Sequence, residues 1–224
     1  MLHAVDAEAL ARPAFRVVLV RADGATAGTF SLSAQRTVVG RSEGTLLIPD
    51  DPYVAGAHCA LLLTGGTLEI EDLQSGSGTW LKVPPGESIR LGSGSEIRLG
   101  HQRLVLEAMP APDWQPGEPK VWGSPDPGYL VRLVQHLEGG GTGAIWPLTE
   151  GSVLLGREEG EIRFPSDGFV SGRHARLTVK ADASVYFEDV GSSNGSYLRL
   201  RQRTKLSVGD LVLVGTHLLR IEAG

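Results

Sequence analysis

The sequence predicts an all-β protein built from two β-sandwich domains in tandem. The apolar residues of the 224-residue chain fall in short runs of strand length, and Gly, Asp or Ser separates most of these runs. The two flanks of the chain are similar to each other, which indicates the same fold twice. A proline-rich segment lies between the flanks and marks a boundary.

Composition excludes several classes of protein. Hydrophobic residues make up 41% of the chain, enough for a core, and 21 basic against 26 acidic residues give a formal charge of −5. That charge argues against a nucleic-acid partner, and because no apolar run approaches the length of a membrane span, we expect no membrane insertion. The single cysteine, Cys59, excludes a multi-cysteine metal site.

In chain order, residues 1–13 are predicted to be an N-terminal tail and residues 14–108 the first sandwich domain. The tail lacks the basic and apolar regions of a signal peptide, so we expect a cytoplasmic protein. Residues 109–127 are predicted to be a semi-rigid linker, because proline removes backbone donors and favours extended chain. Trp114 and Trp122 lie in this linker, and one or both are expected to pack on a neighbouring domain.

Residues 128–224 are predicted to be the second sandwich domain, a copy of the first. His58 and His174 lie 116 residues apart, as do the two Gly-Arg pairs that precede them. Residues 91–107 align without gaps to residues 206–222 at an offset of 115. An offset that drifts by so little over a whole domain predicts two complete domains rather than a solenoid.

Three polar clusters of the second copy fall between strand-like runs, where loops present binding groups. They are Gly156-Arg157, residues 170–175 (VSGRHA) and residues 189–196 (DVGSSNGS). Guanidinium groups, hydroxyls and the backbone N–H groups of glycines suit a doubly charged phosphate. No base, metal ligand set or lysine is arranged to act on that phosphate, so the clusters predict binding rather than catalysis.

The ordered set of these clusters, followed by the LSVGD and RIE segments, resembles the forkhead-associated (FHA) family of phosphothreonine-recognition β-sandwiches. The resemblance implies that Ser171 binds the phosphate, that Arg157 binds phosphate oxygens or the peptide backbone, and that Ser193 lies at the pocket wall. It implies that Asn194 binds the main chain of the peptide, and it gives structural roles to three further residues. These are Gly156, His174 and Gly195.

The second copy departs from the family pattern after the binding serine. A basic residue or Asn often follows that serine, and here Gly172 does; Arg173 is therefore a further candidate for phosphate binding. The first copy departs more, since Ala55 stands in place of Ser171 and Ser77 in place of Asn194. We therefore expect the first domain to be a scaffold or a phosphate-independent docking surface.

The function predicted from the sequence is recognition of phosphothreonine-containing proteins, substrates of a Ser/Thr protein kinase, by the second domain. No cofactor or metal is expected. The alternative is a constitutive assembly protein that uses both sandwiches as phosphate-independent interfaces. An enzyme is not expected, because the GSSNG segment matches a hydrolase nucleophile elbow but is followed by a strand pattern and not by a helix.

Overall fold

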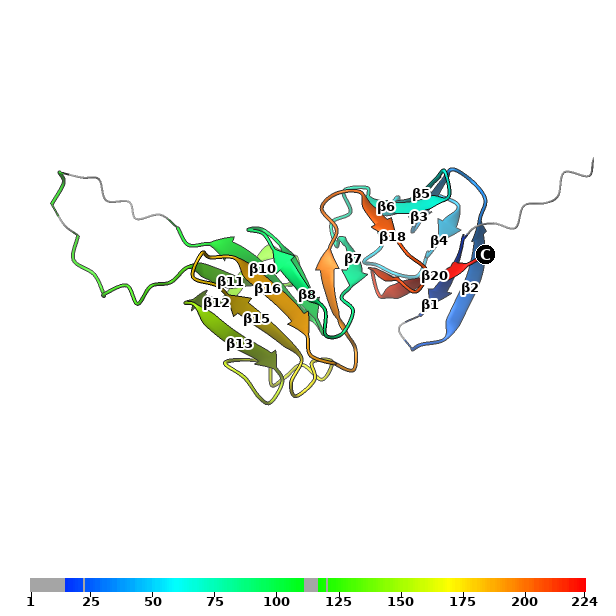
Figure 1. The fold of residues 1–224 in the computed structure, drawn as a ribbon. Helices are drawn as coiled ribbons and strands as arrows, with labels where there is room; N and C mark the ends of the chain where they lie inside the picture. Colours follow the sequence, from blue (N-terminus) through cyan, green and yellow to red (C-terminus); the bar gives the residue numbers. More distant parts are fainter. Residues whose placement is uncertain (1–14, 22, 111–116, 120) are drawn as a thin grey trace, which may run out of the picture. The chain divides into compact units, whose positions relative to one another are not determined.

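The structure, a computed structural model, describes residues 15–21, 23–110, 117–119 and 121–224 (Figure 1). The described residues form 20 strands and a single-turn 3₁₀ helix, Glu138–Gly140, so the all-β fold class is confirmed. The predicted tail, residues 1–13, lies outside the described residues. Among the described residues, no helix has the length and apolar composition to cross a membrane.

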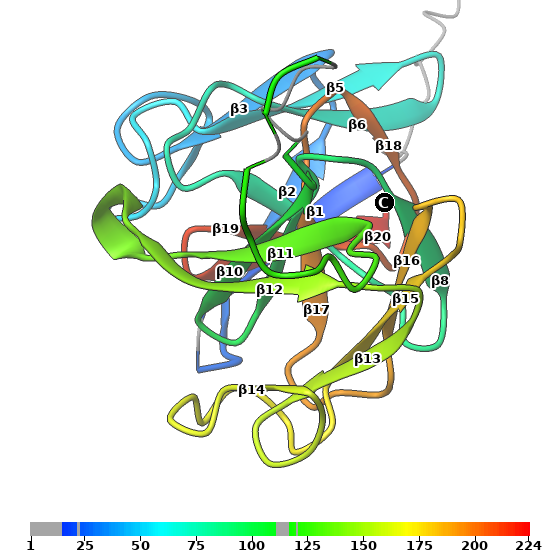
Figure 2. The same cartoon turned by 90° about the vertical axis from the view of Figure 1, so that its left-hand side faces the viewer.

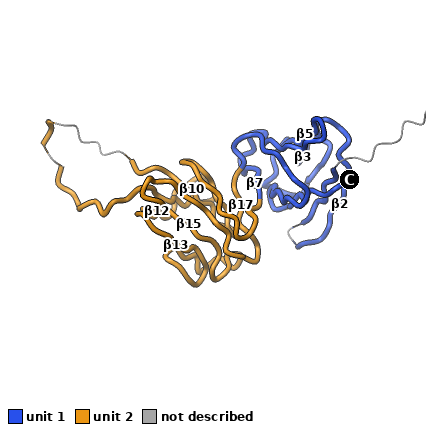
Figure 3. The backbone as a smooth tube through the Cα atoms, viewed as in Figure 1, with its two compact units in different colours: residues 1–81, 200–224 blue, residues 82–199 orange. Residues whose placement is uncertain are grey.

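The chain forms two compact units, each of which is a sandwich of two five-stranded sheets. Unit 1 comprises residues 1–81 and 200–224, and unit 2 comprises residues 82–199 (Figure 3). Each unit has its own apolar core between its sheets. The prediction of two β-sandwich domains is therefore confirmed.

In unit 1, one sheet has the strand order β7-β19-β20-β1-β2 and the other has the order β18-β6-β5-β3-β4. The strands of the first sheet are β1 (Phe15–Val20), β2 (Thr26–Leu32), β7 (Thr79–Lys82), β19 (Leu211–Val214) and β20 (His217–Ala223). Those of the second are β3 (Arg36–Gly40), β4 (Leu46–Leu47), β5 (Cys59–Thr64), β6 (Thr67–Asp72) and β18 (Thr204–Leu206).

In unit 2, the corresponding orders are β12-β11-β10-β9-β17 and β14-β13-β15-β16-β8. The first sheet contains β9 (Glu96–Leu99), β10 (Gln102–Ala108), β11 (Val131–His136), β12 (Thr142–Leu148) and β17 (Ser196–Arg199). The second contains β8 (Ser88–Leu91), β13 (Gly151–Gly156), β14 (Ile162–Arg163), β15 (Ala175–Val179) and β16 (Val185–Asp189).

The last three strands of each sequence copy complete the other unit. Strand β8 pairs with β16, with Leu91 opposite Val185, and β18 pairs with β6, with Leu206 opposite Leu68. Leu104 of β10 is fully buried in the core of unit 2, and its counterpart Leu219 of β20 is fully buried in the core of unit 1. We call this arrangement the strand exchange.

The strand exchange divides the chain differently from the predicted boundaries, 14–108 and 128–224. The chain passes between the units at Leu81–Lys82 and at Arg199–Leu200. The exchange is possible because residues 91–107 and 206–222 share one apolar pattern, so that either segment fits either sandwich and the sequence pattern does not distinguish the two arrangements.

The proline-rich segment 109–127 therefore lies within unit 2 and does not connect the units. Strands β10 and β11, which precede and follow this segment in the chain, are antiparallel neighbours in unit 2, with Ala108 opposite Val131 (Figure 2). Trp122 is 97% exposed, so it is not the tryptophan that packs on a domain, and the expectation that one or both do so stays untested for the other. Trp114 lies outside the described residues.

Candidate functional site

Three loops of unit 2 present the residues that the sequence singles out. Arg157 follows β13, Ser171 precedes β15, and Ser193 and Asn194 lie between β16 and β17. The Arg157 N–H donates to the Ser171 carbonyl at 2.9 Å, and the Ser193 N–H donates to Ser171 Oγ at 3.0 Å. The structure thus brings these residues together around Ser171.

The two neighbours of this centre differ in what they contact. Asn194 Nδ2 donates to the Phe169 carbonyl at 2.8 Å, which joins its loop to the one that carries Ser171. Arg173 Nη1 lies 3.6 Å from a Glu159 carboxylate oxygen, and Arg173 lines a separate depression with Arg176 and Gly191. Among the described residues, no hydrogen bond joins Arg173 to Arg157, Ser171 or Asn194, so Arg173 stands apart from the cluster.

His174 links two of the loops through both nitrogens of its ring. Nδ1 accepts the Ser171 N–H at 3.0 Å, so the proton of the neutral ring sits on Nε2, which donates to the Gly195 carbonyl at 3.3 Å. Burial lowers the pKa of His174 below its ordinary value of 6.5, against the opposing effect of Asp189. A neutral imidazole therefore fixes Ser171 relative to Gly195.

Two glycines are required by close approaches of the chain. A Cβ on Gly156 would overlap the Gly172 carbonyl and lie 2.6 Å from the Glu159 carbonyl. Gly195 has a φ of +81°, a value that residues with a Cβ rarely adopt. A Cβ there would also meet the side chain of Lys82. Both glycines thus hold the loops in positions that other residues cannot.

Sequence reasoning missed the buried carboxylate that organises the Ser193–Asn194 loop. Asp189 Oδ1 accepts the N–H groups of Gly191 and Ser192 at 2.9 and 2.8 Å, and Oδ2 accepts the hydroxyls of Ser192 and Ser196, each at 2.7 Å. Although burial opposes ionisation, these donors hold the pKa of Asp189 below its usual value. The signal was present, because Asp72 stands at the corresponding place of the first copy.

The electrostatics of the site combine free donors with weak ion pairs. Ser171 Oγ accepts one N–H, which leaves the hydrogen of its hydroxyl for another acceptor. The guanidinium of Arg157 is 38% exposed and lies 2.6 Å from a Glu158 carboxylate oxygen. An exposed pair of this kind contributes roughly 1 kcal/mol or less, so a doubly charged anion can replace the carboxylate.

Comparison with known proteins assigns the family. The sequence profile of the FHA domain matches residues 37–100 and 153–215, more than half of the chain. The chain belongs to the FHA-domain family. Each matched stretch contains strands of both units, since the strand exchange carries β8 and β9 into unit 2 and β18 and β19 into unit 1.

Relatives share part of this chain. The FHA domain-containing protein FhaB of Mycobacterium tuberculosis is 38% identical over 88 residues, which cover 39% of this chain and 54% of FhaB. The glycogen accumulation regulator GarA of Mycolicibacterium smegmatis is 32% identical over 102 residues, covering 45% and 65%. The matched residues thus span about half to two thirds of these relatives.

Solved structures of FHA domains are also similar in sequence. One, described as a structural and functional analysis of phosphothreonine-dependent FHA domain interactions, is 28% identical, with a TM-score of 0.27, and the match covers 43% of this chain and 99% of that one. The FHA domain of the CT664 protein from Chlamydia trachomatis is 29% identical, with a TM-score of 0.23, over 37% and 87% of the two chains.

The corresponding loops of unit 1 keep the histidine contacts, and Arg41 stands at the place of Arg157, but two of the polar side chains differ. His58 accepts the Ala55 N–H at 3.1 Å and contacts the Gly78 carbonyl at 3.0 Å, as His174 does in unit 2. Ala55 has no hydroxyl at the place of Ser171, and the hydroxyl of Ser77 donates to the Tyr53 carbonyl. The histidine frame is therefore common to both copies, while the donors differ.

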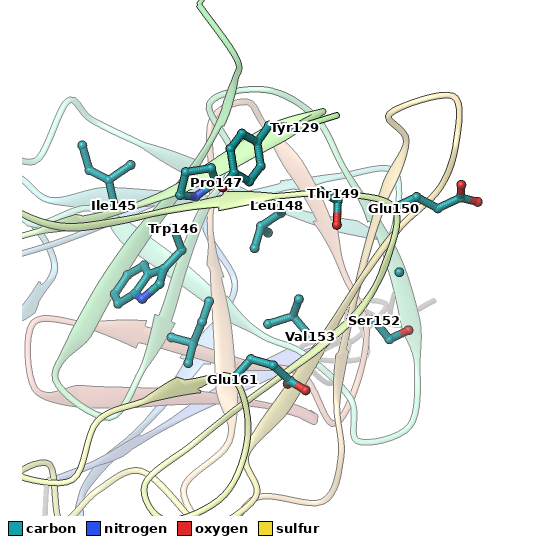
Figure 4. Close-up of a pocket in the computed structure, with 12 residues that line it drawn as sticks. Tyr129, Ile145, Trp146, Pro147, Leu148, Thr149, Glu150, Ser152, Val153 and Glu161 are labelled. Carbon is teal, nitrogen blue, oxygen red and sulfur yellow. The ribbon is translucent and has the colours of Figure 1, made fainter. Parts of the chain in front are cut away.

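Unit 2 of this FHA protein also has a depression of about 330 Å³ between β12 and β13. Figure 4 shows Trp146, Leu148 and Val153 around it. None of the sequence-predicted site residues lines it, so it is separate from the loop cluster. Among the described residues, no group of three His, Cys, Asp or Glu side chains is placed to hold a metal ion.

Proposed function

We propose that unit 2 binds phosphothreonine-containing segments of partner proteins and acts as a recognition module in Ser/Thr kinase signalling. The observation that supports this most directly is the bond from the Ser193 N–H to Ser171 Oγ, because it aligns the Ser171 hydroxyl while leaving its hydrogen available. In the proposal, Ser171 and the Arg157 guanidinium hold the phosphate, and Ser193 lines the pocket. Asn194 then binds the main chain of the peptide beside the phosphate.

The proposal gives the sequence-predicted residues unequal roles. Gly156, His174 and Gly195 position the loops, and Arg173 is a peripheral cation that stays near Glu159. In unit 1, the missing serine hydroxyl and asparagine amide remove two hydrogen bonds to charged or main-chain groups, each contributing about 1.5–3 kcal/mol. Together these losses weaken phosphopeptide binding by roughly 10²- to 10⁴-fold, so unit 1 is proposed to be a scaffold.

The test is a titration of the full chain with a degenerate pool of phosphothreonine peptides and with the same pool unphosphorylated. Arg157→Ala and Ser171→Ala are each expected to weaken phosphopeptide binding roughly 10- to 100-fold, since each removes a hydrogen bond to a charged group. Arg41→Ala, the matched change in unit 1, is expected to leave binding intact. Equal affinity for both pools would contradict phosphate recognition and favour the constitutive assembly protein.

A further inference from the structure

A lysine from the first sequence copy lies against the binding loop of unit 2. The side chain of Lys82 crosses Gly195, so that a Cβ on Gly195 would lie 3.0 Å from Lys82 Nζ and closer still to its Cε. Gly195 directly follows Asn194, the residue proposed to bind the peptide main chain. The ammonium of Lys82 is therefore a neighbour of the proposed peptide path.

Backbone hydrogen bonds fix the segment that carries this lysine. The Val83 N–H donates to the Ser196 carbonyl, and the Gly86 N–H donates to the Asp189 carbonyl, both at 2.8 Å. Asp189 and Ser196 are the residues at the two ends of the binding loop 190–195. Residues 82–86 thus border the whole loop, and the position of Lys82 is set by the fold.

Lys82 differs from the two arginines near the site in its ion pairing. Arg157 lies beside Glu158, and Arg173 lies beside Glu159. Among the described residues, no carboxylate is within ion-pair distance of Lys82. Because the proposed phosphate donors, Arg157 and Ser171, lie on the other two loops, the ammonium of Lys82 is available to a second anion.

We propose that Lys82 selects phosphothreonine peptides that carry an aspartate or glutamate close to the phosphothreonine. This rests on the proposed function, since the acidic side chain is brought to Lys82 by the peptide that Ser171 and Asn194 hold. The strand exchange gives the first copy a role in the second copy's specificity, because it places residues 82–86 along the loop. Neither sequence copy alone contains the complete site.

The experiment measures affinities of the full chain for an aspartate scan of one alanine-rich phosphothreonine peptide. With aspartate at one flanking position, wild-type affinity is expected to rise about two- to fivefold over the all-alanine peptide, and the gain is expected to shrink at high salt. Lys82→Met, which keeps the apolar stem over Gly195, is expected to abolish the gain while leaving the all-alanine affinity within about twofold. Lys82→Arg is expected to retain it.

Lys180→Met is the matched control, because Lys180 is exposed at the far end of β15 from Ser171. This variant is expected to keep the wild-type gain. The role of Lys82 is overturned if Lys82→Met keeps the aspartate gain, or if it weakens all peptides equally, since it then serves the phosphate itself. Weakened binding of every phosphopeptide by Ser171→Ala, together with an unchanged aspartate gain in Lys82→Met, would overturn this inference and leave the proposed function standing.

Discussion

At the scale of single residues, the protonation state of His174 is expected to affect the loop that carries Ser171. A proton on Nδ1 would face the Ser171 N–H and remove the hydrogen bond between them. Burial lowers the pKa of His174, so we expect NMR of the ring to report a titration midpoint below the ordinary value of 6.5. Phosphopeptide affinity measured through that midpoint is expected to fall as the pH falls. A midpoint above 6.5 would contradict this account.

The same shift has a defined effect on stability. The unfolded state takes up a proton at His174 near pH 6.5, before the folded state does, so the free energy of unfolding falls as the pH drops from 6.5 to the folded pKa. His174→Gln, which has no titrating group, is expected to lack this slope. The variant is also expected to be less stable by roughly 1–3 kcal/mol, because a buried donor or acceptor loses its partner.

At the scale of the elements, the strand exchange predicts which strands can be cross-linked. Ser88 of β8 lies opposite Glu188 of β16, and facing residues of antiparallel strands are close enough for a disulfide. We expect Ser88→Cys with Glu188→Cys to form a disulfide within the monomer, detected by mass spectrometry of the peptides. The disulfide is expected to be absent when the chain is oxidised in denaturant and then quenched.

The matched control pairs Ser88→Cys with Glu71→Cys, because Glu71 is the counterpart of Glu188 in the first copy. A disulfide in this variant, and none in the other, would show that each copy is closed by its own strands. In the folded chain, the native Cys59 does not interfere. Burial raises the pKa of its thiol to about 12, so the reactive thiolate is rare at neutral pH.

The sequence predicted the strands and the loop cluster because both depend on local patterns. Arg157, Ser171 and Asn194 each follow from a short motif, and the loops that carry them are joined as expected. The exchange could not be predicted in this way, because residues 91–107 and 206–222 present the same apolar faces to either sandwich. The role proposed for Lys82 was missed because its neighbour Gly195 lies more than 100 residues further along the sequence, and only the strand exchange brings the two together.

At the scale of the whole molecule, phosphopeptide binding by unit 2 is predicted to depend on strands that the first sequence copy contributes to the core of unit 2. Leu104 and Leu219 are counterparts, both fully buried, but Leu104 packs in unit 2 and Leu219 in unit 1. Leu104→Ala is expected to destabilise unit 2 by about 2–5 kcal/mol through the cavity it leaves. The urea concentration at which phosphopeptide binding is half lost should then fall by roughly 1–2 M.

Leu219→Ala creates the same cavity in unit 1. The urea concentration at which phosphopeptide binding is half lost is therefore expected to stay at its wild-type value. Neither variant is expected to change to an arrangement in which each sequence copy is closed by its own strands. Such a change would move the cavity to the other sandwich at the same cost in free energy, so nothing would drive it. If Leu219→Ala lowers the midpoint and Leu104→Ala does not, the second copy uses its own strands. The opposite outcome makes phosphopeptide recognition a property of the interwoven chain, with neither sequence half sufficient to form the site.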